Sequence, residues 1–153
     1  MKMRSQARKP LSRRRGAATV EFAMICIPLF MFLFGVFEYG RYVLALQTFE
    51  NAAREGARFA VVNTFSATVA ADSITEVRKR MANVDQTVFG MPATVTVYAA
   101  DITGANIGPP QNAAFGAFIG VRIQGQFKPV LPTLIITRTI NMDIKALMNS
   151  EAN

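Results

Sequence analysis

The feature that most constrains this chain is an apolar run at residues 17–37, in which Glu21 is the only charged side chain. At about 1.5 Å of rise per residue, a helix over this run is roughly 31 Å long, which matches the hydrocarbon thickness of a bilayer. A lone carboxylate in lipid is costly and is usually paired or functional. We therefore expect one membrane-spanning helix, with Glu21 at an interface or beside a partner.

The basic charge of the chain is concentrated before this run. Seven of the 17 basic residues lie in residues 1–16, which hold no acidic residue, and the remainder carries ten of each sign. A basic flank is typical of the cytoplasmic side of a span, so we expect a cytoplasmic N-terminus and residues from about 43 onward outside the cytoplasm. A nucleic-acid-binding or lipid-surface arm is a competing interpretation. Because no basic face lies downstream, we expect no nucleic-acid partner. Residues 1–15 are expected to be disordered.

The junction between the two segments is a compact motif. Arg13, Arg14 and Arg15 end at Gly16, Ala17 follows, and Glu21 and the aromatic Phe22 lie at the start of the run. A glycine with a glutamate five residues on and then an aromatic residue resembles a prepilin peptidase site. Phe22 stands where the best-known form of that site has tyrosine.

The residues that follow extend this resemblance. The sequence Phe-Glu-Tyr-Gly-Arg at 37–41 and Glu-Asn-Ala-Ala-Arg-Glu-Gly-Ala-Arg at 50–58 is similar to TadE-like pseudopilins of the tight adherence (Tad, or Flp-type) pilus and secretion systems. The similarity covers residues 13–62 and is faint beyond them.

The resemblance implies a minor pilin or pseudopilin, not an enzyme. A prepilin peptidase would cut between Gly16 and Ala17, and the mature helix would pack with other pilin-like subunits to support pilus biogenesis and surface adhesion. The protein would lie in the bacterial inner membrane with its C-terminal domain outside the cytoplasm, and it would be able to enter the pilus. The alternative is an uncleaved single-span protein whose exported domain binds an envelope partner.

Glu21 would acquire a partner on cleavage. The new amino group at Ala17 carries a positive charge near neutral pH, and Glu21 lies one helical turn further on. The spacing allows Glu21 to neutralise its own amino terminus or that of a neighbouring subunit. The family resemblance implies the second role.

The helix is expected to continue to about Val62 as an amphipathic helix, so residues 17–62 form one spine. Four residues, Glu38, Tyr39, Arg41 and Tyr42, form a polar and aromatic cluster of the kind found where a span meets water.

Residues 63–153 are expected to form an exported α+β domain. The sequence predicts a second helix over 66–84, a loop over 103–116, and strands of a small antiparallel sheet near 93–100, 117–127 and 134–146. A long helix followed by a small sheet is also the arrangement of pilin-like proteins. The expected buried face of the sheet is Val97, Ile119, Val121, Ile123, Ile140 and Ile144.

The sequence offers no catalytic constellation. It contains no histidine, and its single cysteine, Cys26, lies within the apolar run. The commonest bases, nucleophiles and metal ligands are therefore missing or misplaced. We expect no enzymatic activity, no metal and no cofactor.

Overall fold

The structure is a computed structural model that describes residues 12–111, 113–114, 116–130 and 139–150. The chain divides into two compact units, residues 1–37 and residues 38–153. The elements are α1 (Ser12–Val62), α2 (Val69–Met81), α3 (Val84–Phe89), β1 (Thr94–Ala100), β2 (Asn106–Gly108), β3 (Phe118–Phe127) and β4 (Ile140–Asn149). The α+β class, with a long first helix before an antiparallel sheet, is confirmed.

Helix α1 is continuous through Pro28 and ends at Val62, as predicted. Its C-terminus is held by Asn63, whose side-chain amide donates to the carbonyl of Phe59 at 2.8 Å. Its start differs from the prediction, because the helix begins at Ser12 and includes residues 12–15, which were expected to be disordered. Residues 1–11 of the leader lie outside the described part of the chain.

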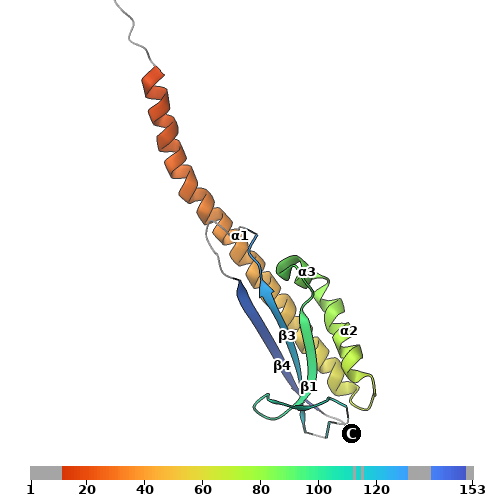
Figure 1. Cartoon of the computed structure of the whole chain (residues 1–153). Helices are drawn as coiled ribbons and strands as arrows, with labels where there is room; N and C mark the ends of the chain where they lie inside the picture. The colour runs from red at the N-terminus through yellow and green to blue at the C-terminus, as the bar shows by residue number, and fades with distance from the viewer. Residues whose placement is uncertain (1–11, 112, 115, 131–138, 151–153) are drawn as a thin grey trace, which may run out of the picture. The chain divides into compact units, whose positions relative to one another are not determined.

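The sheet has the order β2-β1-β3-β4, and all its neighbouring strands are antiparallel. Val97 of β1 faces Val121 of β3, which faces Ala146 of β4, so the apolar residues of the strands line up on one face. In the unit of residues 38–153, this face is covered by the second half of α1 and by α2 (Figure 1).

Small residues allow this cover to lie close to the sheet. Gly56 of α1 is buried, and a Cβ atom there would overlap the side chain of Val77 in α2 and contact Val121 in β3. Larger side chains fill the end nearer α3, where the rings of Phe49 and Phe89 lie 5.1 Å apart. Since protein interiors are close-packed, the space available at each of these positions determines the size of the residue found there.

The second helix is shorter than predicted. The helix α2 ends at Met81, and Ala82 and Asn83 adopt left-handed backbone angles, with φ of 48° and 63°. The short helix α3 then follows, and this helix was not predicted from the sequence. The buried residues of α2 are Val69, Ser73, Val77 and Met81.

The last strand differs at both ends from the prediction. It begins at Ile140 and continues to Asn149, past the predicted end at 146, and predicted residues 134–138 lie outside the described residues. The expected burial of Ile140 is wrong: its side chain is 37% exposed because it pairs with Phe127 at the very end of the ladder. The burial of Val97, Ile119, Val121, Ile123 and Ile144 is confirmed. The predicted loop at 103–116 contains the short strand β2.

Candidate functional site: the N-terminal helix and its base

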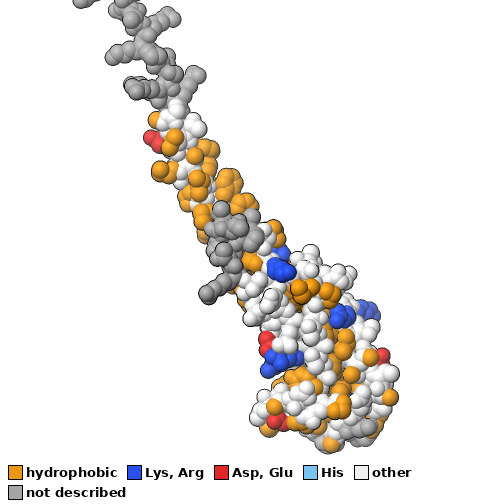
Figure 2. Space-filling view, viewed as in Figure 1, with side chains coloured by type: hydrophobic (Ala, Val, Ile, Leu, Met, Phe, Trp, Pro, Cys, Tyr) orange, Lys and Arg blue, Asp and Glu red, His pale blue; other side chains and the backbone are white. Residues whose placement is uncertain are grey.

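The apolar run forms the exposed first part of α1. Large side chains such as Phe22, Met24 and Phe32 are about 70% exposed in this unit (69%, 72% and 69%). Figure 2 shows hydrophobic side chains in orange along this stretch of helix. Among the described residues, one helix is long and apolar enough to cross a membrane. Exposed apolar surface on this scale requires a lipid or protein environment.

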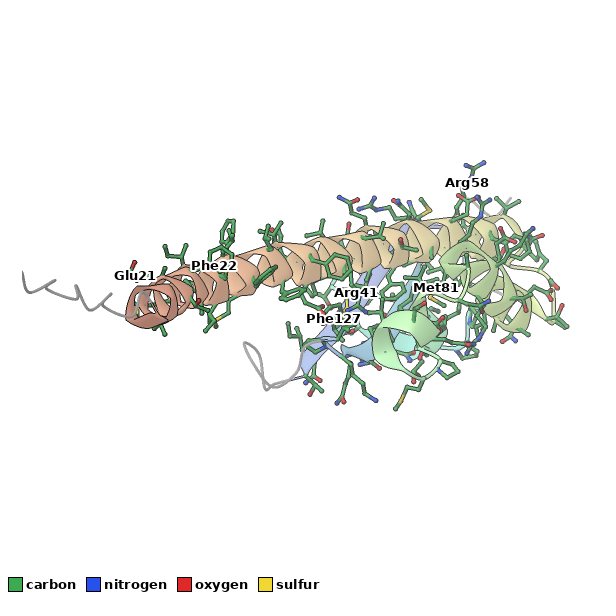
Figure 3. All side chains as sticks on the ribbon, turned by 90° about the horizontal axis from the view of Figure 1, so that it is seen from above. Glu21, Phe22, Arg41, Arg58, Met81 and Phe127 are labelled. Atoms are coloured by element: carbon green, nitrogen blue, oxygen red, sulfur yellow. The ribbon has the colours of Figure 1, made fainter. Side chains whose placement is uncertain are left out.

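The predicted processing residues lie at the start of this helix. Gly16 is exposed and helical, and no neighbouring atom lies within 4 Å of the position where a Cβ would be. Ala17 and Glu21 are also exposed, and Glu21 lies near the first turns of the described helix (Figure 3). Glu21 makes no hydrogen bond or ion pair with any residue that the structure describes. Arg13, Arg14 and Arg15 belong to the first turns of α1.

The four residues of the predicted polar and aromatic cluster differ in their burial. Glu38 is buried, with 7% exposure, and its carboxylate forms an ion pair with the guanidinium of Arg41 at 2.8 Å. The same carboxylate accepts a hydrogen bond from the backbone N–H of Val130 at 2.6 Å. Val130 follows the C-terminal end of β3. The hydrogen bond therefore joins the start of the second unit, at Glu38, to the segment directly after β3.

The aromatic part of the cluster packs on the same strand end. The ring of Tyr42 meets the ring of Phe127 edge-on at 5.5 Å, and the Arg41 guanidinium lies 5.6 Å from the centre of that ring. Figure 3 labels Arg41 and Phe127. Tyr39 points away and is 69% exposed. A role of these four residues at a membrane surface stays a prediction. The sequence does not predict Phe127 and Val130 as their partners, because no local pattern links positions so far apart.

The segment at 50–58 divides its residues between packing and surface charge. Its small residues Ala52, Ala53, Gly56 and Ala57 are buried. Glu50 pairs with Arg54 at 3.0 Å along the helix, and Glu55 reaches Arg80 of α2 at 3.4 Å. The motif therefore encodes the contact between α1, α2 and the sheet, while Arg58 remains exposed (Figure 3).

The comparison with protein families gives a match, and it lies in this helix. Residues 16–58 match the family model TadE, TadE-like protein. The resemblance found in the sequence is thereby confirmed over this segment, which begins at Gly16 and ends at Arg58 in α1. No curated protein and no solved structure matches the chain. Over these residues, the chain is similar to TadE-like proteins.

Within the described residues, no three histidine, cysteine, aspartate or glutamate side chains are grouped so as to hold a metal ion. The clear electrostatic features lie on the sheet instead. Asp143 accepts two hydrogen bonds from the Arg122 guanidinium, at 2.7 and 2.6 Å, which lower the pKa of Asp143 and raise that of Arg122.

Proposed function

We propose that the chain is a minor pilin or pseudopilin of a Tad-type pilus assembly system. A prepilin peptidase cuts it between Gly16 and Ala17, and the mature helix then packs with other pilin-like subunits and the assembly machinery. The protein is inserted once in the bacterial inner membrane, with its N-terminus in the cytoplasm. It supports pilus formation and surface adhesion without acting as an enzyme.

One observation carries this proposal. The TadE-like match begins at the glycine of the predicted cleavage site and continues through the exposed apolar helix into the packed part of α1. The match thus joins Gly16 of the predicted processing motif, the predicted span and the packed segment at 50–58. A simple membrane anchor requires only the second of these three features.

The geometry adds a condition on cleavage. Gly16 and Ala17 are helical, whereas a protease binds its substrate in an extended form. The first turns of α1 must therefore unwind before the peptide bond is cut. Glycine lowers the cost of this step, because it is about 1 kcal/mol less favourable than alanine within a helix.

The proposal is tested by replacing Gly16 with leucine. We expect Gly16→Leu to accumulate as the uncut precursor, because the side chain blocks close approach to the backbone and strengthens the helix at the site. Gly35→Leu is the matched control, since Gly35 lies in the same helix with no atom near its Cβ position. That variant should be processed normally.

Mass spectrometry of the membrane-extracted proteins measures the result. A mature wild-type chain that starts at Ala17, together with uncut Gly16→Leu, supports the proposal. A wild-type chain that keeps residues 1–16 in cells with an active prepilin peptidase favours the uncleaved single-span alternative.

A further inference from the structure

The two edges of the sheet are built differently. At one edge, β2 has three residues, and its pairing with β1 contains a register shift at Ala99 and Ala100. At the other edge, β4 pairs with β3 through ten consecutive residues without a shift. Among the described strands, β4 is the outermost and pairs with β3 alone (Figure 1). Short and irregular edges resist pairing with other chains, whereas long regular edges allow it.

The direction of the backbone groups of β4 follows from one hydrogen bond. Ser150, directly after β4, donates its N–H to the carbonyl of Ala117 beside β3 at 2.7 Å. Backbone groups alternate between the two sides of a strand with a period of two. The even-numbered residues of β4 therefore bond to β3. The outward-pointing groups belong to Asn141, Asp143, Lys145, Leu147 and Asn149.

These outward groups line a groove. A cavity of about 520 Å³ lies between α1 and β4, and its wall on the strand side is the continuous segment 143–148. The opposite wall is formed by Leu46, Glu50 and Arg54, which are spaced one helical turn apart on α1. The groove is thus bounded along its length by unpaired backbone groups, which is the geometry that strand addition requires.

The charges beside the groove favour an acidic occupant. Asp143 is held by Arg122, and Glu50 is paired with Arg54. Lys145 stands directly opposite Arg122 in the register. Its charge helps to lower the pKa of Asp143, although no described residue forms an ion pair or a hydrogen bond with Lys145. Like charges opposite each other destabilise a sheet, so a carboxylate placed next to Lys145 would offset this repulsion.

We propose that the free edge of β4 and the groove beside it bind an extended segment of another polypeptide, which joins the sheet as a fifth strand and places an acidic side chain next to Lys145. The backbone of β4 supplies the affinity, and Lys145 selects among possible segments. This inference does not depend on cleavage after Gly16.

The anchoring of the chain argues against a second copy as the occupant. Two identical β4 strands related by a two-fold axis would be antiparallel. Ile140 of β4 pairs with Phe127, which contacts Tyr42 and Arg41 near the start of the second unit. An antiparallel partner would place its own residue 38, which follows the apolar run, at the opposite end of the pair. The apolar runs of the two copies would then continue from opposite ends of the pair, which does not suit two chains anchored in one membrane.

The test uses the full-length protein in detergent micelles and a fluorescein-labelled peptide of eight residues. The peptide alternates threonine and valine and carries one central glutamate. Leu147→Pro removes an outward N–H without removing a bond to β3, and Leu147→Thr is its matched control because it changes the side chain and keeps that N–H. We expect the peptide to bind wild type and Leu147→Thr alike, and Leu147→Pro about fivefold to tenfold more weakly, the value of about one net hydrogen bond.

A second arm tests the charge. Lys145→Glu should weaken binding of the glutamate peptide and strengthen binding of the same peptide with a central lysine. Circular dichroism checks that each variant is folded, and Asn149→Pro replaces Leu147→Pro if the latter unfolds. Equal binding by the proline variant and wild type, or no saturable binding by wild type, would overturn the inference. So would a wild-type homodimer in light scattering that the proline variant abolishes, since the occupant would then be a second copy.

Discussion

The carboxylate of Glu38 accepts a hydrogen bond from the backbone N–H of Val130 at 2.6 Å, and so joins two residues that are 92 positions apart in the chain. The same carboxylate pairs with Arg41, whose guanidinium lies over the ring of Phe127. Glu38 is the residue that directly follows the apolar run. The first charged group after the span is therefore part of the folded unit itself.

Replacement of this carboxylate should weaken the unit. Glu38→Ala leaves the Val130 N–H and the Arg41 guanidinium without their acceptor in a site where the Glu38 side chain is only 8% exposed. We expect a loss of about 1–3 kcal/mol in the free energy of unfolding. Urea unfolding of the full-length protein in detergent, followed by circular dichroism, measures this loss.

Glu50→Ala is the matched control on the same helix. Its ion pair with Arg54 is exposed on both sides, at 41% and 62%, so its loss should change stability by no more than about 0.5 kcal/mol. Equal effects of the two substitutions would show that the bond to Val130 contributes nothing to stability.

A second prediction concerns the close contact of α1 with α2. Gly56→Ala adds a Cβ that overlaps the side chain of Val77, which is fully buried and has no room to move. Overpacking of this kind costs about 1–3 kcal/mol, against a gain of about 1 kcal/mol in helix propensity. Gly40→Ala has the same gain without the overlap, because nothing lies near its Cβ position. Thermal unfolding should therefore show a lower midpoint for Gly56→Ala alone; equal midpoints would contradict the packing.

The sequence predicted the elements whose signals are local. The end of α1 near Val62, the small-residue face of that helix and the alternation in β3 all depend on neighbouring residues. The burial of Glu38 and the partial burial of Tyr42, apart from the exposed Tyr39, could not be predicted in this way. Both depend on Phe127 and Val130, which the sheet brings close to Glu38. The turn at Ala82 and Asn83 was also not predicted. Glycine is the usual sequence signal for a left-handed backbone, and neither residue is glycine.

The pair Arg122–Asp143 gives a prediction on pH. Hydrogen bonds from Arg122 lower the pKa of Asp143 in the folded state, and desolvation opposes them only in part. A lowered folded pKa contributes stability above the unfolded pKa of about 3.9, and this contribution is lost as the pH falls through the folded pKa. Asp143→Asn should thus be less stable than wild type at neutral pH, and the difference should shrink in acid. Urea midpoints across this pH range measure it, and a constant difference would contradict the assignment.

We predict the orientation of the chain from its basic leader. A phosphatase reporter that is active only outside the cytoplasm should be active when fused after Val62 and inactive when fused before Gly16, because the leader holds the N-terminus inside. Cytoplasmic abundance of both fusions is the control for expression. The reverse pattern would contradict the proposed topology and, with it, the access of a prepilin peptidase to Gly16.

The last prediction concerns Glu21, which is exposed on the apolar part of α1 and has no ion-pair partner among the described residues. An unpaired carboxylate in lipid costs about 2.5–3.5 kcal/mol on insertion scales, so an amino terminus from an adjacent helix would favour association and fix its register. Glu21→Gln keeps the size of the side chain and removes the charge. We expect this variant to be inserted and cut after Gly16 but defective in assembly with its partner subunits, whereas the exposed control Glu50→Gln assembles normally. Co-purification from membranes and a pilus-dependent adhesion assay measure the defect. Full adhesion by Glu21→Gln would reduce Glu21 to a residue that marks the end of the span, and failure of cleavage would place it in the recognition site of the peptidase.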